Sequence, residues 1–284
     1  MHANNKRLPP WFRIRLTTNE NLADVRSLVK KKRLHTVCQS AACPNQTECW
    51  SARTATFMLL GTVCTRGCAF CNVPKGTPSG LDRDEPNRVA EAVEALRLRY
   101  AVITSVTRDD LSDGGASVFA DTIKAIRLRA PGCRIEVLVP DFQGSSTSLQ
   151  AVLDAKPDVL NHNVETVPSL YPTVRPQADY RRSLDLLAHA GKSGSITKTG
   201  LMLGLGEGNN EVLKVLHELR AIGCSILTLG QYLQPKKNNL KVEKFYHPNE
   251  FDSLREQALQ LGFRHVVAGP LVRSSYHADK YGGA

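Results

Sequence analysis

From residue 56 onward, short runs rich in β-branched and aromatic residues alternate with amphipathic segments of helical period. This alternation is the pattern of repeated strand–helix units, and it favours a parallel sheet covered by helices. The expected strands span residues 57–63, 100–106, 135–139, 159–164, 196–203 and 226–232, and the expected helices span 86–98, 116–130, 146–155, 180–190, 210–222 and 248–261. Six units are too few to close an eight-stranded barrel, so the sequence predicts an α/β fold, an open (β/α)6 partial TIM barrel.

The length of 284 residues suits one main domain with additions at both ends. We expect an N-terminal extension over residues 1–55, the partial barrel over 56–262 and a C-terminal tail over 263–284. Parallel α/β folds place their chemistry at the carboxyl ends of the strands. Functional side chains are therefore expected in the loops that follow the strands.

The eight cysteines suggest metal binding more than disulfides. No apolar run approaches the roughly 20 residues needed to span a bilayer, and the first residues lack the apolar core of a secretory signal. We therefore expect a cytoplasmic protein without a membrane partner, where a reducing environment keeps thiols free.

The formal net charge of +10 suits an acidic partner, such as a nucleic acid, an anionic cofactor or an acidic protein, but it also suits a plain solvated surface. Residues 30–33 form the densest basic run, and they follow apolar residues at helical spacing. Cations favour the last turn of a helix. The run is therefore interpreted first as a solvated helix end and second as a docking patch.

Cys64, Cys68 and Cys71 place three thiols within eight residues, in a loop that Gly67 allows to fold tightly. A cubane iron-sulfur cluster held by three cysteines keeps one iron open for another ligand, whereas structural zinc sites use four protein ligands. Zinc knuckles also favour two residues between cysteines, and the first gap here has three. The spacing favours an iron-sulfur cluster.

A second triad, Cys38, Cys43 and Cys49, lies upstream with gaps of four and five residues. These thiols again suit a cluster with one ligand that is not a cysteine. The alternative is a zinc knuckle that His35 completes.

The pattern of Cys64, Cys68 and Cys71, with Phe70 before the last cysteine and a strand before the first, resembles the signature of the radical S-adenosylmethionine superfamily. The resemblance implies that the open iron is chelated by the amino and carboxylate groups of S-adenosylmethionine, which is then split to a 5'-deoxyadenosyl radical. Such a radical removes hydrogen from unactivated C–H bonds, which acid-base side chains cannot do.

Several side chains near the expected mouth of the barrel are candidates for holding S-adenosylmethionine. Asn163 and Glu165, two apart on the expected fourth strand, would share a face and offer hydrogen bonds to ribose hydroxyls or to the amino group. Arg175 and Lys198 are the nearest basic candidates for the carboxylate. Phe70 would stack near the adenine or shield the cluster.

Four further motifs occur together with the two triads: residues 35–38 (HTVC), 54–58 (TATFM), 161–166 (NHNVET) and 273–276 (RSSY). This combination is similar to the lipoyl synthase family over almost the whole chain. The resemblance implies insertion of two sulfur atoms, at C6 and C8, into an octanoyl group on a lysine of a lipoyl carrier domain. It further implies that Cys38, Cys43 and Cys49, with a serine of the RSSY motif, hold an auxiliary [4Fe-4S] cluster that donates the sulfur. Ser275 is the predicted ligand, followed by Ser274.

The same resemblance implies the cofactors and partners. The cofactors are two [4Fe-4S] clusters and S-adenosylmethionine. The carriers are E2 subunits of 2-oxoacid dehydrogenases and the glycine cleavage H protein, the electron donor is a ferredoxin or flavodoxin, and an iron-sulfur carrier rebuilds the spent cluster. The basic surface then becomes a dock for an acidic carrier domain.

Two alternatives differ in their partner. One is a radical enzyme that inserts sulfur into or methylthiolates tRNA, which the positive charge suits. The other is a zinc-stabilised module that binds nucleic acid, for which six strand–helix units give little reason. No recognisable RNA-binding domain accompanies the motifs, so we expect no nucleic-acid partner.

Overall fold

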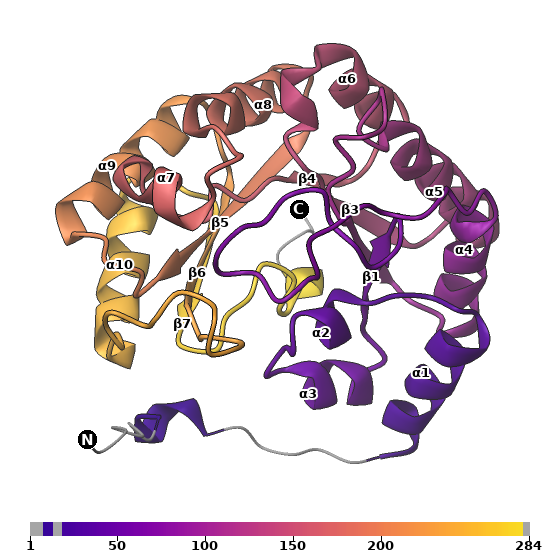
Figure 1. Cartoon of the computed structure of the whole chain (residues 1–284), viewed down its shortest axis with the longest axis horizontal. Coiled ribbons are helices and arrows are strands. Elements are labelled where there is room, and N and C mark those ends of the chain that lie inside the picture. The colour runs from indigo at the N-terminus through magenta and orange to yellow at the C-terminus, as the bar shows by residue number, and fades with distance from the viewer. Residues whose placement is uncertain (1–7, 14–18, 281–284) are drawn as a thin grey trace.

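The computed structural model describes residues 8–13 and 19–280. Its centre is one sheet of seven parallel strands in the order β1-β2-β3-β4-β5-β6-β7, curved into an open arc (Figure 1). The strands are β1 (Thr56–Leu59), β2 (Tyr100–Ser105), β3 (Arg134–Leu138), β4 (Val159–Asn161), β5 (Ile196–Leu203), β6 (Ile226–Gln231) and β7 (His265–Gly269). Each strand pairs with the next one in the chain, which is the arrangement that repeated strand–helix units produce.

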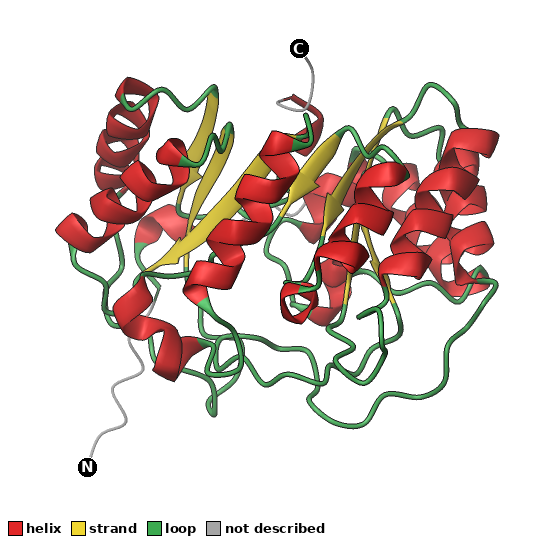
Figure 2. Cartoon of the chain, turned by 90° about the horizontal axis from the view of Figure 1, so that it is seen from above, coloured by secondary structure: helices red, strands yellow, loops and turns green. Residues whose placement is uncertain are grey.

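Six helices follow the first six strands and line the convex side of the sheet (Figure 1). They are α4 (Glu85–Ala95), α5 (Ala116–Arg129), α6 (Ser146–Asp154), α8 (Tyr180–Lys192), α9 (Asn209–Ala221) and α10 (Pro248–Gln260). The short α7 (Tyr171–Val174) and the 3-10 helices η1 (Pro10–Phe12), η2 (Phe142–Gly144), η3 (Pro168–Leu170) and η4 (Ala278–Lys280) complete the set outside the N-terminal extension. The longer loops gather along one edge of the strands (Figure 2).

The two faces of the sheet carry different side chains. Leu201, Leu203 and Leu229 belong to the apolar cluster shared with the helices. Gly200 and Gly230 alternate with these leucines and face the concave side, which we call the lumen. Because these two positions carry no side chain, the lumen has room here for another segment of the chain.

The predicted open partial barrel is confirmed, and each of the six predicted helices is present with its ends shifted by three residues or fewer. One strand was not predicted. β7 lies in the segment that the sequence analysis assigned to the tail, and it pairs with β6 as an edge strand whose five residues are all half-buried. A short, partly exposed edge strand lacks the continuous apolar run that marks buried parallel strands.

The N-terminal extension forms α1 (Glu20–Lys31), α2 (Val37–Ser40) and α3 (Gln46–Ser51). The chain between α1 and α2 runs along the free edge of β1, where Met58 donates its N–H to the carbonyl of His35 (2.9 Å). Thr36 and Phe57 form an antiparallel bridge there. α2 and α3 thereby lie between the β1 and β7 ends of the arc (Figure 1).

After β7 the tail turns back into the lumen. A Cβ on Gly230 would collide with the carbonyl oxygen of Val272, and Ala278 packs against Tyr100 and Val102 near the start of β2. The tail therefore passes along the concave side, from the carboxyl ends of the strands toward their amino ends.

Within residues 8–13 and 19–280, none of the helices combines the length and the apolar character required to cross a membrane.

Candidate active site

The loop of residues 64–71, which we call the radical loop, follows β1 and is closed by backbone hydrogen bonds. Cys64 donates its N–H to the carbonyl of Pro74 (2.8 Å), and Gly76 donates to the carbonyl of Cys64 (3.0 Å). Thr65 donates to Thr107 (3.0 Å), which ties the loop to the segment after β2. The backbone that carries the first cysteine is therefore fixed from two sides.

Buried charge holds the middle of the radical loop. The Arg66 guanidinium donates to Asp109 (2.6 and 2.8 Å) and to Asp141 (2.6 Å), and Arg182 also reaches Asp141 (3.3 Å). Burial alone would raise the pKa of Asp141, but Arg66 lowers it to about 2. The Asp141 carboxylate therefore stays ionised at neutral pH. Removing one member of such a buried set leaves an uncompensated charge, which costs about 3–5 kcal/mol.

Two amide side chains complete the support. Gln177 accepts the N–H of Gly67 (2.7 Å), and the Asn239 side chain donates to the carbonyls of Ala69 (3.0 Å) and Cys71 (2.9 Å). The supports of the radical loop therefore come from the loops after β2, β3, α7 and β6. The sequence analysis missed Arg66, Gln177 and Asn239. The only local signal was a cationic residue between two cysteines.

The three thiols of the radical loop act on one another electrostatically. The pKa of Cys68 is raised to about 11, chiefly by burial, with contributions from the neighbouring Cys71 and Cys64, and Arg175 opposes these effects. Burial also raises the pKa of Cys71, and Cys64 contributes. A bound iron cluster requires thiolates and would displace these protons. Across the described ranges, no three His, Cys, Asp or Glu side chains form the ready-made shell of a single metal ion.

Asn163, Glu165 and Arg175 are brought together beside the radical loop. Arg175 donates through Nη1 to the carbonyls of Asn163 (2.8 Å) and Val164 (3.2 Å), while Asn163 donates from its side chain to Glu165 (3.1 Å). Burial raises the pKa of the Glu165 carboxyl, and Arg175 and Asn163 lower it. Ala69 donates its N–H to Val174 (2.9 Å), so Arg175 lies next to the loop of the cysteines.

The meeting of Asn163 and Glu165 has a different cause from the one that the sequence suggested. β4 ends at Asn161, and Glu165 has a left-handed backbone with φ of 66°. The two side chains therefore do not share a strand face. A bend after β4 and a direct hydrogen bond bring them together.

The donor set near Cys68 fits S-adenosylmethionine at one atom in particular. The Nε of Arg175 is buried and has no hydrogen-bond partner among the residues that the structure describes. A buried unsatisfied donor is costly, and a ligand carboxylate is a chemically suitable partner. Phe70 packs beside this group, in a cluster with Val174, Leu205 and Tyr232.

Lys198 is not part of that group. It is 2% exposed, and its Nζ donates to both oxygens of Glu136 (2.9 and 3.0 Å). Tyr100 and Asn161 also donate to Glu136 (both 2.8 Å). Lys198 is the third residue of β5, so it lies near the amino end of the strand, away from the radical loop. Its charge is already paired.

The upstream triad lies on α2, α3 and the turn between them. Cys43 donates its N–H to the carbonyl of Cys38 (3.0 Å), which folds the turn back on itself. Burial raises the pKa of Cys49 to about 12, and Cys38 and Cys43 are the next largest causes. These three thiols therefore also lie within electrostatic range of one another.

The C-terminal tail lies against this triad. Asn45 donates from its side chain to the carbonyl of Leu271 (2.7 Å), and the Tyr276 hydroxyl donates to Glu48 (3.0 Å). The charge of Arg273 lowers the pKa of Cys43 against the larger effect of burial. Residues 273–276 and the upstream cysteines are thus neighbours although more than 200 positions separate them.

The two serines of the tail differ in their contacts. The Ser274 hydroxyl donates to Asn163 Oδ1 (2.7 Å). The Ser275 hydroxyl has no hydrogen bond within the described part of the chain. The tail therefore contacts the Asn163 group with one serine and leaves the next serine open.

Similarity to known proteins identifies the family of this chain. Residues 58–219 match the Radical SAM superfamily. The chain is 54% identical over 277 residues to the lipoyl synthase of Shouchella clausii strain KSM-K16, covering 96% of this chain and 90% of the relative. It is 53% identical to the lipoyl synthase of Caldicellulosiruptor saccharolyticus, covering 96% of both chains. The chain belongs to the lipoyl synthase family.

Solved structures agree on the fold of this lipoyl synthase family member. Methylornithine synthase matches with a TM-score of 0.56 at 15% identity, over 94% of this chain and 88% of that chain. SuiB of Streptococcus suis bound to S-adenosylmethionine matches with a TM-score of 0.58 at 9% identity, over 79% of this chain and 54% of that chain. At these identities the likeness shows a shared radical SAM-type fold alone.

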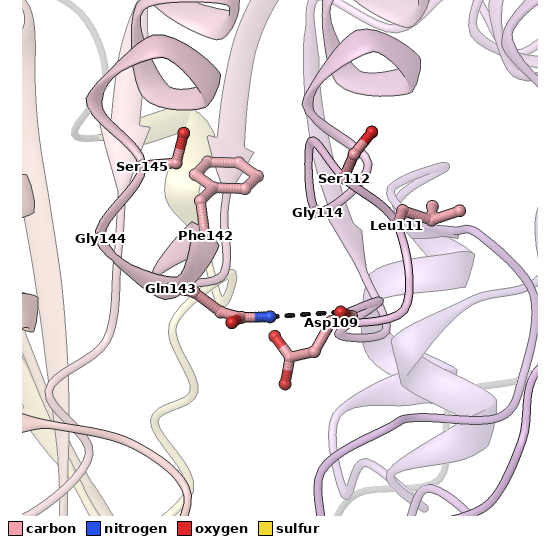
Figure 3. A pocket seen from close by; sticks show the side chains of 8 residues that line it. All are labelled: Asp109, Leu111, Ser112, Gly114, Phe142, Gln143, Gly144 and Ser145. Atoms are coloured by element: carbon pink, nitrogen blue, oxygen red, sulfur yellow. Dashed lines mark hydrogen bonds between the residues drawn. The ribbon is translucent and has the colours of Figure 1, made fainter.

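A cavity of about 420 Å³ lies beside the radical loop, at the carboxyl ends of β2 and β3 (Figure 3). Gln143 donates to the carbonyl of Asp109 across it (3.2 Å), and the carboxylate of Asp109 holds Arg66. The cavity is lined by Asp109, Leu111, Ser112, Gly114, Phe142, Gln143, Gly144 and Ser145. None of the predicted cluster ligands lines it.

Proposed function

We propose that this lipoyl synthase family member inserts sulfur at C6 and C8 of an octanoyl group on a carrier lysine, with each cysteine triad holding one [4Fe-4S] cluster. The observation that carries this proposal is the tail, in which Tyr276 contacts Glu48, the residue before Cys49, and Ser274 contacts Asn163. Two residues of one segment thus reach the surroundings of both thiol sets.

In the radical half, Cys64, Cys68 and Cys71 would bind one cluster, and the cluster with S-adenosylmethionine supplies a radical that removes hydrogen from C–H bonds. Arg175 would donate from its unpartnered Nε to the methionine carboxylate. Glu165, oriented by Asn163, would accept from the amino group. Phe70 would exclude water from the cluster. Lys198 is left out because its ammonium group already forms an ion pair with Glu136.

In the sulfur-donating half, Cys38, Cys43, Cys49 and Ser275 would hold the auxiliary cluster. Ser275 is favoured over Ser274 because the hydroxyl of Ser274 already donates to Asn163. A serine oxygen is a harder ligand than a thiolate and a poorer match for iron in a sulfide cluster. The corner that it holds should open most easily, which favours release of sulfur.

In this proposal residues 1–55 carry the donor-cluster cysteines, 56–262 form the radical barrel, and 263–284 carry the serine and also supply β7. The proposed carriers are E2 subunits of 2-oxoacid dehydrogenases and the glycine cleavage H protein. The proposed reductant is a ferredoxin or flavodoxin, and an iron-sulfur carrier would rebuild the consumed cluster. The proposed compartment is the cytoplasm.

The test is anaerobic purification followed by an assay with an octanoyl-lysine peptide, S-adenosylmethionine and dithionite. Two clusters predict about eight irons per chain, and mass spectrometry should show a product that has gained two sulfurs. About four irons per chain would contradict the two-cluster assignment. Release of 5'-deoxyadenosine without any sulfur gain would contradict the proposed reaction.

A further inference from the structure

The loop that joins β6 to α10 reaches across to the radical loop (Figure 1). Leu240 donates its N–H to the carbonyl of Ala69 (3.3 Å), next to the two bonds from the side chain of Asn239. The Tyr232 hydroxyl donates to the carbonyl of Leu240 (2.7 Å), which gives the backbone of Leu240 a second hydrogen bond. The loop is therefore fixed beside the first three thiols.

This loop exposes lysines that have no ion-pair partner. Lys236, Lys237 and Lys241 are exposed, and within the described ranges none of them forms a salt bridge. Lys244 differs because it pairs with Glu250 (2.6 Å). Glu243 is the one acidic residue between Lys236 and Lys244, so the exposed charge of the loop is positive.

Lys75 adds a fourth unpaired cation on another side of the radical loop. It is exposed, and its backbone is paired with Cys64. Its Cδ would lie 2.7 Å from a Cβ placed on Gly67, so its side chain runs over the glycine between the first two cysteines. We call Lys75, Lys236, Lys237 and Lys241 the lysine rim.

The densest basic run of the sequence offers less free charge. Lys32 pairs with Glu91 (2.5 Å), and the charge of Arg33 contributes to lowering the pKa of Asp82, after the larger effect of Arg88. Lys30 and Lys31 occupy the last turn of α1, where the helix dipole favours cations. This run has a structural reason that needs no partner.

Resting on the function proposed above, we infer that the lysine rim is the docking surface for the carrier domain and that it recognises an acidic face around the modified lysine. The substrate chain is attached to a protein, so that protein must meet the surface that borders the radical loop. Unpaired lysines there attract an acidic face and steer the encounter, and salt weakens the attraction.

The test compares two triple variants with the same change in net charge. K236E/K237E/K241E reverses three of the four rim lysines, and K30E/K31E/K192E reverses exposed lysines on α1 and α8. KM and kcat are measured with an octanoylated carrier protein and with a neutral octanoyl-lysine peptide, at about 0.05 and 0.5 M salt. We expect the rim variant to raise KM for the carrier about tenfold or more at low salt and to lose the salt dependence of the wild type. Turnover of the peptide should stay within about twofold, and the control triple should behave as the wild type.

Several outcomes overturn the docking surface. Equal effects of the two triples would mean that only net charge matters, and an unchanged KM for the carrier would place the dock elsewhere. Loss of peptide turnover in the rim variant would show that the loop serves the chemistry instead. Competition by tRNA that the rim variant abolishes would assign these lysines to nucleic acid. A wild type that converts neither substrate contradicts the proposed function itself, which separates the two failures.

Discussion

The two cysteine triads are similar in composition and different in how the fold holds them. The radical loop is held by closing backbone bonds and by the ion pairs of the buried Arg66 with the half-buried Asp109 and the buried Asp141. The upstream triad lies on the short helices α2 and α3, and its surroundings are completed by a tail 226–228 positions away. The radical loop is a site at the carboxyl ends of the strands. The surroundings of the upstream triad are complete only when the tail lies against α2 and α3, so its failures should be separable from those of the radical loop.

The largest expected effect is on the radical half. Cys68→Ala should remove one of three cluster thiols and abolish formation of 5'-deoxyadenosine, while bound iron falls to about half. Chromatography of the reaction mixture and an iron assay measure both. Cys133→Ala is the matched control because Cys133 is buried outside both triads. Normal deoxyadenosine release from Cys68→Ala would remove this cysteine from the radical site.

The next effect separates the halves. Ser275→Ala should keep formation of 5'-deoxyadenosine and lose sulfur insertion, because the proposed auxiliary cluster would lose its proposed fourth ligand. Ser274→Ala should lose one hydrogen bond to Asn163, worth about 1 kcal/mol, and so reduce sulfur insertion by no more than about tenfold. Product mass and deoxyadenosine are measured together. Full lipoyl product from Ser275→Ala, with loss in Ser274→Ala, would reverse the ligand assignment.

A third prediction concerns the path of the tail. Gly230→Ala places a methyl group against the carbonyl of Val272 and should destabilise the protein by about 1–3 kcal/mol while displacing the tail. Gly132→Ala is the control because nothing lies within 4 Å of its added Cβ. Denaturant unfolding and protease sensitivity of the tail check the result. If the two variants unfold alike, the tail does not depend on Gly230 for its place in the lumen.

The smallest expected effect is a loss of folding stability in acid that comes from His162. Burial and the neighbouring Arg175 lower the pKa of His162 to about 4, and its two ring nitrogens contact Val139 and Ser183 (2.8 and 3.0 Å). Because the pKa of His162 is lower in the folded state than in the unfolded state, the neutral ring contributes its full share to the free energy of unfolding above the unfolded pKa of about 6.5. That contribution is lost as the pH falls toward 4. Between pH 7.5 and 6 the loss should be about 1 kcal/mol.

Unfolding titrations of the wild type and His162→Gln at those two pH values check this. The variant should show the smaller difference, since it carries no titrating group at this position. Identical pH dependence in both proteins would mean that His162 is not held neutral by the fold.

The fold was predictable because strand–helix alternation repeats locally along the chain. β7 was not predicted because it is a short edge strand of five residues, all of them partly exposed. Among the site residues, the cysteines are local signals, and their neighbours are not. Lys198 and Arg175 are both basic candidates in the sequence, yet Lys198 forms a buried ion pair with Glu136, whereas Arg175 keeps an unpartnered nitrogen beside the radical loop.

The sequence by itself determined the two sets of thiols and the parallel sheet, since chelating spacings and hydrophobic periods are properties of a few consecutive residues. Only the tertiary structure decided which other residues lie beside those sets. Gly200 and Gly230 leave the lumen open to the tail, and the tail then places Ser274 against Asn163 and Tyr276 against Glu48. Such contacts depend on packing between segments far apart in the chain, which no local pattern encodes.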